Sequence, residues 1–398
     1  MKRLLSALLL GAVILLPAVL TPSSLTYTYH VGRVCERYAL SIDFVVGGYS
    51  RASPALEIRL SKHATLKVFA TSGPEPMPGV YLEADGKALA SAVLLLHPSN
   101  RYRLILTAND DFFKAGLAAL DGGWLADPVR RLPPLYKQGL AFGSGLWYFT
   151  GTSILIKLDR EGEVLDFNSD PIPSKLKKEG YFHLGDPDYW NGTLYVPVER
   201  RGYLRPAVLA AYNPTTLELA RYSYTPQDHM PWVAVDKEGR LYTSEYSPVD
   251  EVLMYRAEDI GEGGHAEPIR KVRLNRTLDG VQGGAFYDGK LYLSVMDGWI
   301  YEVDPGDGGV RRAFQVPNFY EMEGIEVLDE GGRISCYVLV NTGGDWNMLY
   351  CYVKVPRGFR KTLLTVKEGL PTGPSIKVRV NAPTSLLAFN FSSLPPRP

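Results

Sequence analysis

A strand-and-turn pattern recurs along the middle of the chain, and it limits the possible folds more than any other feature. Each copy has an apolar segment that usually opens on Gln-Gly or Glu-Gly, then a glycine-containing turn, then a second segment with Leu-Tyr or a similar pair. Close copies begin at Gln138, Asp186, Gln282 and Glu323, and a looser copy begins at Pro231. A period of about 40–50 residues with several strand signals is typical of the blades of a β-propeller. The repeats therefore predict an all-β chain with a propeller over residues 137–366.

Each repeat also has room for a fourth, outer strand. Segments at residues 163–167, 217–221 and 310–314 are expected to supply these strands. Five full blades are visible in this way, and a sixth could be hidden in less regular sequence. The repeats therefore favour five blades, with six as the open alternative. The chain's 25 Tyr, 39 Gly and 29 Pro agree with many short strands joined by tight turns.

The segment before the repeats is predicted to form a separate domain. Residues 25–108 contain strictly alternating runs, such as residues 38–45 and 102–107, which are typical of half-buried antiparallel strands. They predict a small β-sandwich. Residues 109–136 are expected to be a linker that includes a short helix near residues 110–120.

After the repeats, residues 367–398 are expected to hold two more strands and a Pro-rich tail. The strands are expected at residues 376–380 and 386–391. Two alternatives stay open for them, because they could return to the N-terminal sandwich or complete a sixth blade.

Residues 1–24 have the features of an export signal. Met1-Lys2-Arg3 is followed by an apolar run from Leu4 to Leu20 and a short polar segment. This pattern predicts a signal peptide, or an uncleaved anchor because the run is near the lower limit for a membrane span. We therefore expect an extracellular or cell-surface protein that meets a membrane only through this segment. Glycosylation sequons compatible with that compartment lie at Asn191, Asn275 and Asn390.

The charges of the chain balance, with 43 Lys and Arg against 43 Asp and Glu. Long-range electrostatics therefore attracts the chain as a whole neither to nucleic acid nor to anionic membranes. A nucleic-acid partner is not expected, and the predicted partner is a small molecule or a protein at the propeller face.

Cys336 and Cys351 are placed symmetrically about Gly343-Gly344. In a hairpin that turns at this pair the two cysteines would face each other, within the reach of a disulfide. The sequence therefore predicts a cross-strand disulfide, with two buried free thiols as the alternative. Cys35 is left over and could be free or could pair with another chain.

The start of each innermost propeller strand points towards the central channel, so the aligned repeats predict which side chains converge. The candidates are Gln138, His183, Asp186, Asp188, His229, Trp232, Gln282, Glu323 and Glu326. Rings of oxygen ligands can hold a hard cation such as calcium, and a histidine with a carboxylate can do acid–base chemistry. The possible metal ligands among them are His183, Asp186, His229 and Glu323. A third alternative is structural, because polar residues at strand starts often hydrogen-bond exposed amides or link neighbouring blades.

The first repeat is similar to a known enzyme family. Gln138-Gly-Leu-Ala-Phe142 followed by residues 146–151, Leu-Trp-Tyr-Phe-Thr-Gly, resembles the opening of the propeller-type glutamine cyclotransferases. That family has Gln-Gly-Leu-x-Tyr and then Leu-Tyr-Glu-Ser-Thr-Gly, and Tyr148 stands where it has its Glu. The match covers under a tenth of the chain. More broadly, the repeats resemble the gluconolactonase and strictosidine-synthase-like propellers, and that resemblance implies a calcium ion on the central axis.

Three functions follow from these observations. The first is an exported propeller that binds a ligand or a protein, with the sandwich as an accessory module. The second is a metal-dependent hydrolase or lactonase, in which Glu323, Asp186 and His183 or His229 hold a divalent ion that activates water. The third, which rests on the resemblance alone, is an acyltransferase of the glutaminyl cyclotransferase type.

Overall fold

A computed structural model describes most of the chain. The described residues are 24–31, Val34, 36–46, 53–70, 79–93, Leu96, 100–109, 111–316, 320–367, Leu370, 372–373, 375–381 and 384–393. The predicted signal segment, apart from Ser24, lies outside these residues, as does Cys35. The chain divides into two compact units, Met1–Ala126 with Lys354–Pro398, and Asp127–Val353. Among the described residues, no helix has both the length and the apolar character needed to cross a membrane.

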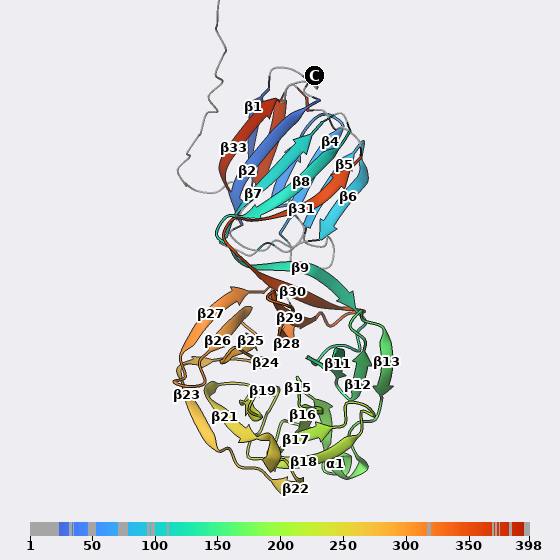
Figure 1. Ribbon diagram of the computed structural model, residues 1–398, viewed down its shortest axis with the longest axis vertical. Helices are drawn as coiled ribbons and strands as arrows, with labels where there is room; N and C mark the ends of the chain where they lie inside the picture. The colour runs from blue at the N-terminus through green and yellow to red at the C-terminus, as the bar shows by residue number, and fades with distance from the viewer. Residues whose placement is uncertain are drawn as a thin grey trace, which may run out of the picture. The chain divides into compact units, whose positions relative to one another are not determined.

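The unit Asp127–Val353 is a β-propeller, and Figure 1 shows its sheets around a common centre. Its first sheet contains β10 (Gly139–Gly143), β11 (Leu146–Gly151), β12 (Ile154–Leu158) and β13 (Val164–Asn168) in that order. The second contains β14 (Tyr181–Leu184), β16 (Thr193–Arg200), β17 (Ala207–Tyr212), β18 (Leu219–Thr225) and β22 (Glu262–His265), with β15 (Asp188–Trp190) paired to β16. A short helix, α1 (Ser174–Lys178), precedes β14.

Three further sheets follow in the described part of this unit. The third contains β19 (Ala234–Val235), β20 (Arg240–Thr243), β21 (Val249–Arg256) and β23 (Arg270–Leu278), with the 3-10 helix η1 (Ala257–Asp259) after β21. The fourth contains β24 (Val281–Tyr287), β25 (Lys290–Val295), β26 (Trp299–Val303) and β27 (Val310–Gln315). The fifth contains β28 (Glu321–Asp329), β29 (Ile334–Asn341), β30 (Asn347–Val355) and β9 (Gly123–Leu132). Because β9 precedes β10 in the chain, this last sheet joins the two ends of the unit and closes the ring.

Local sequence explains the first hairpin of three of these sheets. The turns are Ser144-Gly145, Asn191-Gly192 and Asp288-Gly289, and both residues of each turn have positive φ. Two successive positive φ angles define the type I′ turn, whose twist matches that of the strands it joins. Strands in the middle of a sheet are apolar on both faces, as in β17, where all six residues are buried. Such strands need cover on both sides, and the neighbouring sheets supply it.

The cores of the propeller lie between neighbouring sheets. Tyr148 of the first sheet packs in one cluster with Val196 and Val208 of the second. Trp232, which precedes β19, and Tyr242 of the third sheet pack with Leu293 of the fourth. Each fully buried large apolar side chain stabilises the fold by about 1.5–3 kcal/mol. Stacking of the sheets is therefore the main source of the unit's stability.

The other unit contains two antiparallel sheets. One has the order β1 (Ser24–His30), β32 (Ser375–Asn381), β3 (Leu56–Arg59), β4 (Ala64–Phe69), β5 (Gly79–Ala84) and β6 (Lys87–Val93). The second has the order β31 (Phe359–Val366), β8 (Phe113–Ala119), β7 (Arg101–Ala108), β2 (Tyr38–Val45) and β33 (Ser385–Ser393). Every second residue of β7 is buried, which is the alternation expected of a strand with one face in the core.

Two predictions about domain organisation are corrected here. The expected linker over residues 109–136 is instead occupied by β8 and β9, and residues 113–119 form a strand rather than a helix. β8 is held between β7 and β31, and these tertiary pairings override a weak local helical pattern. The propeller unit ends at Val353 rather than at residue 366, because β31 belongs to the other unit. The C-terminal strands β32 and β33 also return to that unit and do not form a sixth blade.

The predicted disulfide between Cys336 and Cys351 is wrong. Both cysteines are buried free thiols. In the β29–β30 hairpin Cys336 is opposite Tyr352, and Cys351 is opposite Tyr337. The pairing is thus shifted by one residue from the predicted symmetry, and a shift of one residue moves a side chain to the opposite face of the sheet. The two sulfurs therefore do not face each other.

Candidate functional site

Asp186 lies between β14 and β15, and its carboxylate reaches three other sheets. Oδ1 accepts a hydrogen bond from the N–H of Leu140 in β10 at 3.0 Å. Oδ2 accepts hydrogen bonds from the N–H of Gly284 in β24 at 3.1 Å and of Ile325 in β28 at 3.3 Å. Burial raises the pKa of the fully buried Asp186 well above its usual value, and the three N–H donors oppose that rise. Asp186 is therefore a structural anchor whose two oxygens are already in use.

Three glycines of the repeat pack so closely against Asp186 that a larger residue would collide with it. A Cβ added at Gly324 would lie 2.2 Å from Asp186 Oδ1, and one at Gly139 would lie 2.5 Å from the same oxygen. A Cβ at Gly283 would lie 2.8 Å from Oδ2. Real Cβ atoms do not approach other atoms so closely, so only glycine fits at these three positions. The Gln-Gly and Glu-Gly openings of the repeat thus record the close packing of inner strands around Asp186.

Asp188 and Glu326 link neighbouring sheets. Asp188 Oδ2 accepts a hydrogen bond from the N–H of Val235 in β19 at 2.6 Å, and Glu326 Oε2 accepts one from the N–H of Phe142 in β10 at 2.9 Å. The other oxygen of each carboxylate accepts the N–H of the next residue in the chain. Burial raises the pKa of Asp188 to about 7 and the pKa of Glu326 well above its usual value. Both side chains are thus held by backbone amides.

Trp232 is a packing residue rather than a stacking surface for a ligand. Its ring is fully buried, and its Nε1–H donates a hydrogen bond to Ser244 Oγ at 3.0 Å. A Cβ added at Gly284 in the fourth sheet would lie 2.2 Å from the ring, so the backbone there already touches it.

The other predicted residues do come together, in a continuous polar network that we call the mouth ring. Its members are Gln138, His183, Glu199, His229, Gln282, Glu321, Glu323 and Asn341. Gln138 Nε2 donates a hydrogen bond to Glu323 Oε1 at 3.2 Å, and Gln138 Oε1 contacts His183 Nε2. His183 Nδ1 lies 2.8 Å from Glu199 Oε2, and His229 Nε2 lies 3.3 Å from Glu199 Oε1. The fully buried Glu199 carboxylate therefore lies between two histidines.

The second half of the mouth ring is formed by carboxylates and amides. Gln282 Nε2 donates a hydrogen bond to Glu321 Oε1 at 3.0 Å. Asn341 Nδ2 lies 3.1 Å from Glu323 Oε1 and 3.5 Å from Glu321 Oε2. The mouth ring thus connects side chains from the first, second, fourth and fifth sheets, and His229, which precedes β19, adds the third.

Two tyrosine rings lie beside His229. Tyr203 stacks on His229 with ring centroids 4.0 Å apart, and the Tyr246 ring lies 4.7 Å from the same histidine. Tyr203 is 42% exposed and has a positive φ of 49°. A tyrosine in this left-handed region is uncommon and is often found at functional sites. The mouth ring therefore has an aromatic edge that solvent can reach.

Burial and neighbouring charges shift the pKa values of several groups in and beside the mouth ring. Burial, together with the nearby Glu321, raises the pKa of Glu323 well above its usual value. Burial also raises the pKa of Tyr203, and the charges of Glu199, Glu321 and Glu323 add to the rise. No lysine or arginine side chain is hydrogen-bonded to the mouth ring in the part of the chain that the structure describes. Burial lowers the pKa of His229, which favours its uncharged form.

The four predicted metal ligands do not meet at one point. Asp186 accepts hydrogen bonds from backbone amides, and Glu323 accepts them from two side-chain amides. His183 and His229 both contact Glu199. No group of three or more His, Cys, Asp or Glu residues within the described ranges is arranged to hold a metal ion. The residues present therefore do not fit a calcium ion on the axis.

The repeat alignment missed Glu199, Asn341 and Tyr203. Glu199 is directly opposite His183 in the β14–β16 pair, and Asn341 is opposite Glu321 in the β28–β29 pair. The first two strands of a sheet are antiparallel, so the end of the second strand lies beside the start of the first. A polar residue at the end of an apolar second strand could therefore have identified Glu199 and Asn341 as members of the mouth ring. Tyr203 lies in a loop, where the repeat gives no register.

No protein-family model matches the chain, and no curated protein matches it. Among solved structures, the glutaminyl cyclase of Myxococcus xanthus is similar over 60% of this chain and 99% of its own, with 15% identity and a TM-score of 0.44. BamB from Moraxella catarrhalis is similar over 74% of this chain and 84% of its own, with 12% identity and a TM-score of 0.31. The Pan2 WD40 domain of Neurospora crassa is similar over 78% of this chain and 95% of its own, with 10% identity and a TM-score of 0.33. All three TM-scores are below 0.5, so the assignment of a β-propeller rests on the sheets described above.

Proposed function

We propose that this chain is a binding protein in which a five-bladed propeller presents the mouth ring to a small ligand that carries a positive charge. The observation that supports this most directly is a pair of carboxylates, Glu199 and Glu321, to which no lysine or arginine is bonded within the described residues. An organic ammonium group is attracted by carboxylates and by the faces of tyrosine rings. Tyr203 and Tyr246 provide such faces next to the carboxylates.

The two enzymatic alternatives have less support. A metal-dependent hydrolase needs ligands that converge, and the predicted ligands pair with backbone or with one another. A cyclotransferase of the resembled family has a glutamate where Tyr148 stands. Tyr148 is buried, and its ring stacks on Tyr189 at 5.8 Å, so the position carries no carboxylate. Binding is the function that needs only the groups observed at the mouth ring.

We also propose that the binding takes place outside the cell. Residues 1–24 support this through their export-signal pattern. The two sheets of the other unit fit the role of an accessory β-sandwich. N-terminal sequencing of protein recovered from the medium and from membranes tests the export: a new N-terminus near residue 24 is expected, and cytoplasmic recovery of the intact chain contradicts it.

Titration calorimetry with tetramethylammonium, benzylammonium and Ca²⁺ tests the ligand class. We expect saturable binding of an organic ammonium ion and weaker binding of Ca²⁺. Glu321→Gln replaces a carboxylate by an amide and should weaken ammonium binding by about tenfold. Tyr203→Ala removes an exposed aromatic face and should weaken it by about two- to fivefold.

Glu262→Gln is the matched control, because Glu262 is an exposed carboxylate of β22, outside the mouth ring. It should bind as the unmodified protein does. If no ammonium probe binds, or if Glu262→Gln weakens binding as much as Glu321→Gln does, the proposal fails. Tight Ca²⁺ binding that depends on Glu323 would support the metal hypothesis instead.

A further inference from the structure

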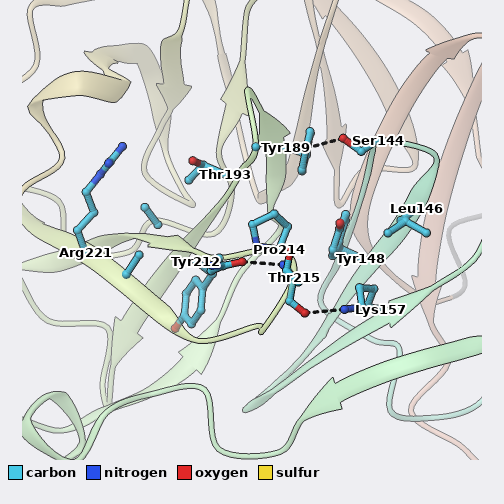
Figure 2. A pocket seen from close by; sticks show the side chains of 14 residues that line it. Ser144, Leu146, Tyr148, Lys157, Tyr189, Thr193, Tyr212, Pro214, Thr215 and Arg221 are labelled. Atoms are coloured by element: carbon cyan, nitrogen blue, oxygen red, sulfur yellow. Dashed lines mark hydrogen bonds between the residues drawn. The ribbon is translucent and has the colours of Figure 1, made fainter.

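Two clefts lie near the opposite ends of the inner strands from the mouth ring. The first, drawn in Figure 2, has a volume of about 570 Å³ and lies between the first and second sheets. The second has a volume of about 590 Å³ and lies between the second and third sheets. Arg221 of β18 lines both. We call the second one the arginine cleft, because Arg221, Arg240 and Arg256 all line it.

Arg221 is a cation whose hydrogen bonds are incomplete. Its Nε atom is buried and has no hydrogen-bond partner, and its Nη2 atom lies 3.5 Å from the hydroxyl of Tyr195. Within the described residues no carboxylate forms an ion pair with it. In Figure 2 its guanidinium extends away from Lys157, whose ammonium already donates to the carbonyl of Thr215 at 2.7 Å. The buried Nε is out of reach of a ligand, so an anionic ligand would bind the terminal Nη groups of this unpaired cation.

A second pair of cations lines the arginine cleft. Arg240 of β20 and Arg256 of β21 are directly opposite each other in the antiparallel pair. Like charges at opposed positions repel each other. Arg240 is neutralised by Asp236 at 2.5 Å and by Glu238 at 3.0 Å. The exposed Arg256 has no side-chain hydrogen bond or ion pair within the described ranges.

The arginine cleft is also lined by an aromatic ring and two carboxylates. Trp190 forms one wall, and its ring lies so close to Gly239 that a Cβ there would be 2.7 Å away. Two carboxylates also line the cleft, Glu238 and the exposed Glu258. Glu238 is already paired with Arg240. Glu258 can balance one of the two unpaired arginines at most, so a positive charge remains.

We propose that the arginine cleft binds the phosphate or carboxylate group of a small anionic ligand through Arg221 and Arg256, with the Trp190 ring as one wall. Guanidinium groups donate paired hydrogen bonds to both kinds of oxyanion. This site is separate from the mouth ring. Tyr195, at the cleft, and Glu199, at the mouth, are four residues apart on β16, or about 13 Å at the rise of an extended strand. The two sites would bind ligands of opposite charge.

Calorimetric titration of the full chain with inorganic phosphate and, separately, with benzoate tests the proposal. We expect saturable binding of at least one probe in the millimolar range or tighter, about 4 kcal/mol or more. The probe that binds more tightly shows whether the natural ligand carries a phosphate ester or an aromatic carboxylate. Arg221→Gln and Arg256→Gln should each weaken binding by about tenfold or more.

Arg273→Gln is the matched control, because it removes the same charge from an exposed position on β23 that does not line the cleft. If Arg221→Gln does not fold, the exposed Arg256→Gln decides the outcome. Failure of both probes to saturate overturns the proposal. Equal weakening by Arg273→Gln also overturns it, because the binding would then be a general charge effect. Neither result bears on ammonium binding at the mouth ring, which Glu321→Gln tests separately.

Discussion

The carboxylate of Asp186 accepts a hydrogen bond from the backbone N–H of Gly284, which is 98 residues further along the chain, at 3.1 Å. With the N–H groups of Leu140 and Ile325, this bond joins the second sheet to the first, fourth and fifth. One side chain thus fixes the inner strands of four sheets. Positioning of the mouth ring depends on it, since Gln138 and Glu323 precede the glycines that pack against it.

We predict that Asp186→Asn strongly destabilises the propeller. The amide nitrogen of Asn would point a donor at backbone N–H donors and leave at least one without an acceptor. The expected loss in the free energy of unfolding is on the order of 3 kcal/mol. Urea denaturation followed by tryptophan fluorescence measures it. The control Asp259→Asn, at an exposed position, should stay within about 0.5 kcal/mol of the unmodified protein. A similar small effect of Asp186→Asn would disprove the anchoring role.

The packing of glycine against this carboxylate gives a second prediction. Gly324→Ala would place a Cβ 2.2 Å from Asp186 Oδ1 and 2.5 Å from the Cα of Gly139. Backbone atoms cannot move aside cheaply, so we expect a loss of more than about 3 kcal/mol or failure to fold. Gly264→Ala is the comparison, because a Cβ there meets no atom within 4 Å. Thermal unfolding of the two variants should differ sharply, and equal midpoints would contradict the geometry.

The raised pKa of Asp188 gives a prediction of how the free energy of unfolding depends on pH. Its pKa is raised from 3.8 to about 7 by burial, so between these values the folded state holds a proton that the unfolded state has lost. The free energy of unfolding should therefore fall as the pH rises through this range. Asp188→Asn carries no titrating group and should remove that part of the slope. Urea midpoints of both proteins, measured from about pH 4 to about pH 8, provide the check. Parallel profiles would show that folding does not raise the pKa of Asp188.

Cys336 and Cys351 give a prediction about covalent structure. Because they face Tyr352 and Tyr337 rather than each other, the two thiols should not be oxidised to an internal disulfide. Alkylation should label both cysteines in denaturant without a reductant, and neither in the native state, where both are buried. Mass spectrometry of peptides reads the labels. A cross-linked Cys336–Cys351 peptide would restore the prediction made from the sequence.

The sequence by itself determined the all-β class, the repeats and their turns. Turn residues such as Asp288-Gly289 act locally, because their positive φ angles are favoured by the residues themselves. The openings Gln138 and Glu323 were placed correctly beside each other in the mouth ring, because a repeat fixes which positions are equivalent. Local chemistry and internal alignment are both properties of sequence.

Tertiary structure alone decided the rest. The register of the β29–β30 hairpin differs from the symmetric one by a single residue, and a shift of that size separates Cys336 from Cys351. β31 joined β8 in the other unit because pairing partners are chosen by burial over long distances in the chain. Asp186 and Glu323 have the same place in the repeat, yet Asp186 accepts hydrogen bonds from backbone amides and Glu323 from side-chain amides of the mouth ring. Their different roles follow from which groups surround each carboxylate in space, and the repeat pattern does not encode those surroundings.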